Sequence, residues 1–189
     1  MRNVVVALTV IALTCPFCVS FGGELIMADF DSGTKPNNIG GDFGAWSSSA
    51  EDYTQGCYES FDQVNALGGT GSCMKLEYDV NSPQPAYCGF WMKTAGQLDA
   101  SSHSNLVIWM KSDAATGGTS RVKIELKTET ERGAYYVDGI NPSWTRFAVL
   151  LDDFLISDFS TFQELVIVFE DHTSQPKEGA IYVDSVSLE

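Results

Sequence analysis

The sequence predicts an all-β protein, a two-sheet antiparallel β-sandwich of the jelly-roll type, and three observations support this fold class. No window keeps the apolar period of a helix, about 3.6 residues, over three turns. Apolar and charged residues instead alternate with a period of two in several segments. Short runs of Gly, Pro, Asn and Ser separate these segments, and roughly eight or nine short strands at such spacing are typical of sandwiches and jelly rolls.

The alternation is clearest at residues 74–80 and 121–127, where each strand is predicted to have one buried and one solvated face. We expect further strands at residues 86–93, 106–111, 134–137, 146–151, 165–170 and 180–188. A single helical turn is expected near residues 152–155. Residues 33–65 are rich in Gly, Asn, Ser and Asp and are predicted to form a long loop, which either contributes to a binding site or only covers a sheet edge.

The first 22 residues have the pattern of a secretory signal peptide, so a single domain is expected over residues 23–189. A positive start precedes an apolar run at residues 4–13, and small residues follow near the expected cleavage point. One alternative is lipid attachment at Cys15 or Cys18, although the residues before them fit a lipoprotein signal poorly. The other is an uncleaved membrane anchor, which would need a longer apolar run. The sequence therefore predicts a secreted or cell-surface protein.

The charge balance excludes two classes of partner. The chain has 25 acidic and 11 basic side chains, for a formal charge of −14. Because nucleic acids and anionic membranes would be repelled, neither is expected as the main partner. No interior segment approaches the ~18 to 20 apolar residues of a membrane span, so none is expected in the mature chain.

Residues 74–80 and 86–92 are predicted to form a hairpin across the turn at residues 81–85. Pairing Val80 with Ala86 places Tyr78 opposite Cys88 on an apolar face that belongs to the core. The other face then combines aromatic and charged side chains, namely Lys75, Glu77, Asp79, Tyr87 and Trp91.

Three cysteines remain after the signal peptide, and an exported protein can keep one disulfide among them. The sequence alone does not identify the pair. In the hairpin register Cys88 points into the core, which favours a bridge between Cys57 and Cys73 with Cys88 unpaired.

A sugar-binding face needs flat aromatic rings for the apolar side of a pyranose and convergent polar groups for its hydroxyls. The alternative is that the aromatic rings pack in the core and that the Lys/Glu alternation is an ordinary solvated sheet face. The candidate carbohydrate-binding residues are Glu77, Asp79, Tyr87, Trp91, Lys123, Glu125, Tyr136 and Arg146.

Six segments in this order resemble a calcium-dependent jelly-roll carbohydrate-binding domain: residues 34–46, 74–80, 89–92, 106–113, 123–127 and 179–186. The resemblance is to family 11-like carbohydrate-binding modules of the galactose-binding-like superfamily and covers most of residues 25–189. It implies binding of a polysaccharide or oligosaccharide. Members of such families often accompany glycoside hydrolase domains, whereas the length here leads us to expect a stand-alone module.

The resemblance also implies a structural Ca²⁺ that holds the chain ends together. The candidate ligands are Asp29, Asp31 and Asp184, because calcium takes oxygen ligands and the ends of a jelly roll often run as neighbouring strands. Asp184 interrupts an otherwise apolar strand, which is unfavourable unless its carboxylate is paired. The alternative is a surface acid at a β-bulge.

An enzyme is not expected. The carboxylate pairs, such as Glu77 with Asp79, Asp152 with Asp153 and Glu170 with Asp171, arise by chance in an acidic protein. No nucleophile elbow, phosphate loop or His-rich metal motif is present. We therefore expect a secreted, non-catalytic module that binds a β-glucan-like polysaccharide. The alternative is an extracellular structural or adhesion protein that uses the same scaffold for protein contacts.

Overall fold

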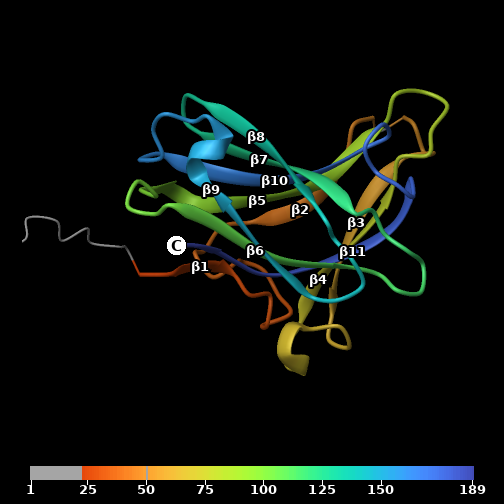
Figure 1. Cartoon of the computed structure of the whole chain (residues 1–189), viewed down its shortest axis with the longest axis horizontal. Helices are drawn as coiled ribbons and strands as arrows, with labels where there is room; N and C mark the ends of the chain where they lie inside the picture. Colours follow the sequence, from red (N-terminus) through yellow and green to blue (C-terminus); the bar gives the residue numbers. More distant parts are fainter. Residues whose placement is uncertain (1–22, 50) are drawn as a thin grey trace, which may run out of the picture.

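The computed structural model describes residues 23–49 and 51–189, and it confirms the predicted two-sheet antiparallel β-sandwich (Figure 1). Sheet A has the order β3 (Gly56–Asp62), β4 (Cys73–Asp79), β11 (Glu178–Leu188), β6 (Asn105–Ser112) and β9 (Thr145–Leu150), with β1 (Leu25–Ala28) also paired to β11. Sheet B has the order β2 (Phe43–Ser47), β5 (Tyr87–Leu98), β10 (Phe162–Glu170), β7 (Arg121–Thr128) and β8 (Arg132–Asp138). The core lies between the two sheets.

Every strand expected from the alternation is present. In β7 the side chains of Val122, Ile124 and Leu126 are buried against sheet A, and the residues between them face outward. The expected helical turn is the 3-10 helix η2 (Leu151–Phe154), and a second short one, η1 (Leu67–Gly69), precedes β4. Among the described residues no helix is long and apolar enough to cross a membrane.

The prediction of one long loop at residues 33–65 is wrong, because this segment contains β2 and β3. Both are edge strands: β2 pairs with β5, and β3 pairs with β4. Neither strand contains a β-branched residue, and Gly, Ser or Asp accompany their aromatic residues, but each neighbouring strand offers an open ladder of backbone hydrogen bonds. Strand formation here depends on this tertiary context.

The predicted hairpin between residues 74–80 and 86–92 is also wrong, because β4 and β5 belong to different sheets. The turn between them carries the chain across the sandwich. The alternation was nevertheless interpreted correctly, since Tyr78 of β4 and Cys88 of β5 both face the core. Tyr78 also stacks on Phe169 of β10, with ring centroids 4.2 Å apart, so the two sheets interlock at this point.

The favoured Cys57–Cys73 disulfide is wrong for a geometric reason. The register of β3 and β4 pairs Cys57 with Tyr78, and it pairs Cys73 with Asp62, five residues beyond Cys57. At ~3.4 Å per residue the two cysteines are about 17 Å apart, whereas a disulfide needs Cα atoms within about 7 Å. In the described part of the chain Cys57, Cys73 and Cys88 are all buried free thiols.

The expectation that the chain ends run side by side is confirmed for the domain. Strand β1 pairs antiparallel with the last strand, with Leu25 opposite Leu188 (Figure 1). The pairing of β11 changes partner along its length, from β4 in its first half to β1 in its second half. The expected signal peptide at residues 1–22 lies outside the described residues.

Candidate functional site

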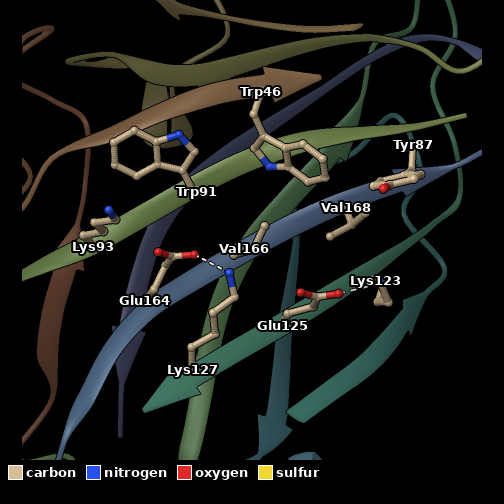
Figure 2. Close-up of a pocket in the computed structure, with 10 residues that line it drawn as sticks. All are labelled: Trp46, Tyr87, Trp91, Lys93, Lys123, Glu125, Lys127, Glu164, Val166 and Val168. Carbon is tan, nitrogen blue, oxygen red and sulfur yellow. Dashed lines mark hydrogen bonds and ion pairs between the residues drawn. The ribbon is translucent and has the colours of Figure 1, made fainter. Parts of the chain in front are cut away.

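The outer face of sheet B contains a groove of about 440 Å³. Strands β2, β5, β10 and β7 all contribute to it, so its walls come from residues far apart in the sequence (Figure 2). It is lined by Trp46, Tyr87, Trp91, Lys93, Lys123, Glu125, Lys127, Glu164, Val166 and Val168.

One side of the groove is aromatic. Trp46 comes from β2, and Tyr87 and Trp91 come from alternate outward positions of β5. Figure 2 shows the three rings along the same side of the groove. Trp46 and Tyr87 meet edge to face, with centroids 5.8 Å apart, and about half of the Tyr87 surface remains exposed. The rings form an accessible apolar surface outside the core.

Two glycines make room for the tryptophan rings. In the ladder between β2 and β5, Gly44 is paired with Trp91 and Gly89 is paired with Trp46. A Cβ atom at Gly44 would lie 3.2 Å from the Trp91 ring, and one at Gly89 would lie 3.1 Å from the Trp46 indole nitrogen. Each indole therefore covers the glycine on the neighbouring strand.

The floor of the groove is apolar. Val166 and Val168 lie at alternate positions of β10, the central strand of the sheet. Val166 is flanked by Trp91 on β5 and Glu125 on β7. Both valines are buried although they face outward, because the rings and the charged side chains enclose them.

The other side of the groove is charged. Lys123 contacts the carboxylates of Glu170 and Glu125, with the Nζ–Oε1 distance to Glu125 at 3.2 Å. Burial lowers the pKa of Lys123, but these two carboxylates outweigh it and raise the pKa above its usual value. Burial raises the pKa of Glu170, but hydrogen bonds from Lys123 and Tyr136 lower it overall. These groups therefore stay ionised at neutral pH.

Two further lysines complete the groove. Lys127 donates a 2.6 Å hydrogen bond to Glu164, which holds the Lys127 ammonium and the Glu164 carboxylate together at the groove (Figure 2). The Lys93 ammonium lies 5.1 Å from the centroid of the Trp91 ring. Among the described residues Lys93 has no carboxylate at ion-pair distance, so its ammonium is available to a ligand.

The structure brings together five of the predicted sugar-binding residues. Tyr87, Trp91, Lys123 and Glu125 line the groove. Tyr136 on β8 adjoins it, and its hydroxyl donates a 2.8 Å hydrogen bond to Glu170.

Three other predicted residues lie on sheet A, so the expectation that they adjoin Tyr87 and Trp91 is wrong. Glu77 and Asp79 are on β4, and Arg146 is on β9. Glu77 accepts a 2.8 Å hydrogen bond from Lys75, and Arg146 forms an ion pair with Glu189. For Glu77 and Asp79 the error follows from the hairpin prediction, which placed β4 beside β5.

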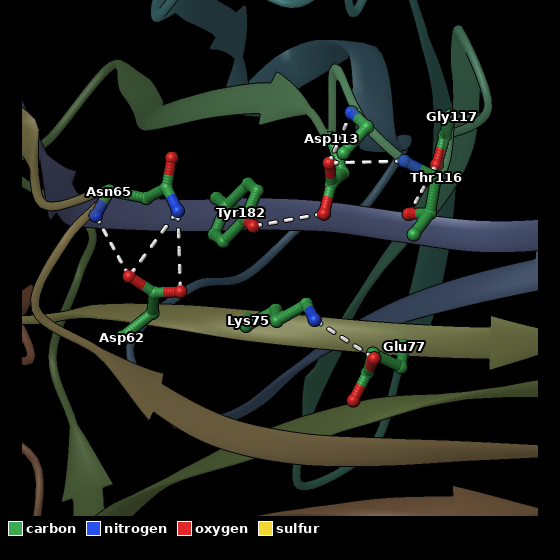
Figure 3. A network of polar contacts seen from close by, with 9 residues as sticks. Asp62, Asn65, Lys75, Glu77, Asp113, Thr116, Gly117 and Tyr182 are labelled. Atoms are coloured by element: carbon green, nitrogen blue, oxygen red, sulfur yellow. Dashed lines mark hydrogen bonds and ion pairs between the residues drawn. The ribbon is translucent and has the colours of Figure 1, made fainter.

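On the outer face of sheet A, polar side chains bond to one another (Figure 3). Tyr182 is buried and donates a 3.0 Å hydrogen bond to Asp113. Lys111 donates to Asn65 and lies between the rings of Trp144 and Tyr182, about 5 Å from each centroid. These polar groups satisfy one another.

Six of the ten groove residues were not among the predicted sugar-binding residues, namely Trp46, Lys93, Lys127, Glu164, Val166 and Val168. Trp46 lay in the segment interpreted as a loop. The alternation at residues 121–127 already placed Lys127 on the face of Lys123 and Glu125. The valines carried no signal, because an apolar residue in a central strand is ordinarily a core residue.

The three predicted calcium ligands lie near the paired chain ends, with Asp29 and Asp31 in the loop after β1 and Asp184 in β11. Asp184 is buried at the bulge where β11 changes partner, and its carboxylate accepts hydrogen bonds from the backbone of Leu67 and Ser185. Burial, together with the nearby charges of Asp31 and Asp29, raises the pKa of Asp184 to about 6. The donor chemistry suits calcium, although the described residues contain no preassembled group of three or more His, Cys, Asp or Glu side chains that could hold a metal.

No protein-family model matches the sequence, and no curated protein sequence matches it. Solved structures share the fold. The family 11 carbohydrate-binding module of the cellulosomal cellulase Lic26A-Cel5E of Clostridium thermocellum has a TM-score of 0.63 and 17% identity, over 88% of this chain and 94% of that chain. A family 11 module of Clostridium thermocellum in complex with a β-1,3-1,4-mixed-linked tetrasaccharide has a TM-score of 0.63 and 16% identity, over 87% and 94% of the two chains.

An exo-β-agarase has a TM-score of 0.64 and 10% identity, over 87% of this chain but only 25% of that chain. The fold is thus that of β-sandwich carbohydrate-binding modules. The expected likeness to family 11 is confirmed at the level of the fold.

Proposed function

We propose that the groove on sheet B binds a neutral polysaccharide of the β-glucan type. The observation that carries this proposal is that two different sides face each other across an apolar floor. The aromatic wall consists of Trp46, Tyr87 and Trp91, and the opposite side is charged. Trp46, Tyr87 and Trp91 offer flat surfaces for the apolar faces of pyranose rings. Lys123 and Glu125 on the other side offer charge-assisted hydrogen bonds to hydroxyl groups. The mixed-linked tetrasaccharide in a module of the same fold supports the same class of ligand.

The shape of the groove supports a chain rather than a single sugar. A second hollow, lined by residues 94–97 and Gln163, shares Lys93 and Glu164 with the groove and extends it at that end. A linear glycan lying along the aromatic wall would continue into this hollow. The net charge of −14 opposes acidic polysaccharides and favours neutral ones.

We propose that this binding is non-catalytic. A glycosidase needs one carboxyl group with a raised pKa to protonate the leaving oxygen. The groove carboxylates are instead paired with lysines, Glu125 with Lys123 and Glu164 with Lys127. The pKa of Glu170 is lowered rather than raised. These pairs suit hydrogen bonding to hydroxyls rather than proton transfer.

Affinity electrophoresis of the purified chain in gels containing mixed-linked β-glucan tests the proposal. We expect the glycan to retard the wild type and to retard Trp91→Ala much less. Tyr58→Ala is the matched control, because Tyr58 is exposed but lies on β3 of sheet A, and its retardation should equal that of the wild type. Unchanged mobility of the wild type on every polysaccharide of a panel would contradict the proposal.

We also propose that Asp29, Asp31 and Asp184 hold a structural Ca²⁺. The support is the burial of Asp184 beside two like charges, which is unfavourable unless a cation offsets it. Backbone oxygens and water would complete the coordination shell. The ion would connect the loop after β1 to β11 and so hold the two chain ends together.

Finally, we propose that the protein is exported with removal of residues 1–22. The support is the tripartite N-terminal sequence pattern. N-terminal sequencing of the protein recovered from the secreting host tests this, and a chain that still begins at Met1 outside the cell would contradict it.

A further inference from the structure

Two buried thiols face each other across the sandwich. Cys57 lies on β3, the edge strand of sheet A, and Cys88 lies on β5 of sheet B. The Cys88 thiol donates a 3.0 Å hydrogen bond to the carbonyl of Gly56, the residue that directly precedes Cys57. The pKa of Cys57 is raised well above its usual value. The larger cause is a hydrogen bond with the Cys88 thiol, and the second is burial. The side chains of Cys57 and Cys88 are therefore close together in the core.

The third cysteine of the domain is too far away to compete. Cys73 donates to the carbonyl of Asp62, at the opposite end of β3 from Cys57. Cys88 contacts the carbonyls of Gly56 and Asp79, and Asp79 lies at the other end of β4 from Cys73. Since a disulfide needs Cα atoms within about 7 Å, Cys73 is excluded as the partner of Cys57, which leaves Cys88 as the candidate.

We propose that Cys57 and Cys88 form a disulfide between the two sheets when the chain folds in the presence of a small-molecule disulfide such as oxidised glutathione. The two thiols lose two protons and two electrons as the S–S bond forms. The electrons reduce the S–S bond of the oxidant to two thiols, through a mixed disulfide. Because both side chains are buried in the finished fold, the exchange takes place while the chain is still folding.

The disulfide would fix a weakly held strand. In the ladders, β3 is paired with β4 alone, so it has one hydrogen-bonded neighbour. A bond to Cys88 would connect β3 directly to the strand that carries Tyr87 and Trp91. It would also close the loop between residues 57 and 88, which restricts the unfolded chain and raises the midpoint of unfolding.

Peptide mapping tests the proposal on the full chain. The reduced, denatured protein is refolded with a mixture of reduced and oxidised glutathione, then alkylated and digested before and after reduction. We expect one linked pair that contains Cys57 and Cys88, lighter by two hydrogen atoms than the reduced peptides, with Cys73 alkylated. A reductant should lower the unfolding midpoint of this product.

Two variants separate the linkage from packing effects. Cys73→Ser should keep both the linked peptide and the response to reductant, whereas Cys57→Ala should lose both. Mapping the wild type decides the matter even if a variant fails to fold. Alkylation of both Cys57 and Cys88 without reduction, after refolding with oxidised glutathione, would overturn the proposal. Linkage of Cys57 to any other cysteine would overturn it equally.

Discussion

Gly44 lies opposite Trp91 in the ladder between β2 and β5, and the Trp91 indole covers it. The next outward pair has the reverse order, with Trp46 on β2 and Gly89 on β5. The aromatic wall therefore depends on two residues without side chains as well as on the rings. A Cβ atom in either place would meet the indole that now rests there.

Gly44→Val should weaken glycan binding while the fold is kept. The valine methyl groups would push the Trp91 ring away from the sheet, since the three atoms nearest to the new Cβ all belong to that ring. We expect about a tenfold loss of affinity, or ~1.4 kcal/mol, by calorimetric titration with mixed-linked β-glucan. A change in tryptophan fluorescence would report the displaced ring without any ligand. Gly89→Ala should instead lower the unfolding midpoint, because its Cβ would lie 2.1 Å from the Ile167 carbonyl oxygen. Wild-type affinity and fluorescence in Gly44→Val would contradict this role.

Trp46→Ala should reduce affinity about as much as Trp91→Ala, since both rings face the same groove. Loss of one ring–sugar contact removes ~1 kcal/mol, which corresponds to about a fivefold weaker affinity. Glu77→Gln serves as the control, because Glu77 is exposed on sheet A and should leave titration curves unchanged. Equal losses for Trp46→Ala and Glu77→Gln would mean that the ligand does not lie on sheet B.

Glu170 should contribute to stability in a pH-dependent way. Burial raises its pKa, but Lys123 and Tyr136 lower it below the value of an unfolded chain, and His172 lies 3.6 Å away. A carboxyl group whose pKa is lowered by folding stabilises the protein above the unfolded pKa, about 4.3. This stabilisation is lost as the pH falls through the lowered folded pKa. Glu170→Gln should therefore destabilise the protein by ~1 kcal/mol at neutral pH and by less in acid. Denaturant unfolding at several pH values measures the difference in free energy of unfolding between the wild type and Glu170→Gln. A difference that does not become smaller in acid would contradict this role of Glu170.

Calcium should raise the unfolding midpoint, because an ion that binds only the folded state stabilises it by mass action. A free concentration 100 times the dissociation constant would add about 2.7 kcal/mol. Asp184→Asn should abolish the shift between calcium and chelator. Asp153→Asn, which changes an exposed acid on η2, should preserve it. Identical melting curves of the wild type in calcium and in chelator would contradict the proposal of a structural Ca²⁺.

Local patterns were sufficient for the faces of individual strands. In β4 and β5 the alternation correctly placed Leu76, Tyr78 and Phe90 toward the core. This succeeds because successive side chains of a strand point to opposite faces, whatever the partner strand is. The same rule placed Lys123 and Glu125 together on one outward face.

The partners of each strand could not be obtained in this way. A five-residue turn at residues 81–85 can close a hairpin or cross between sheets, and the choice depends on which other strands offer free edges. Here β11 pairs with β4 and β10 pairs with β5, so the strands on either side of the turn lie in different sheets. Glu77 was therefore assigned to the wrong face, and Trp46 was missed.

By itself the sequence determined the all-β class, most of the strands and the side of each strand that is buried, since these properties follow from short-range periodicity and composition. Only the tertiary structure decided which strands lie side by side, and with them the groove, the contact between Cys57 and Cys88 and the burial of Asp184. Those contacts join residues far apart in the chain, and their pairing minimises the free energy of the whole sandwich rather than of any one segment.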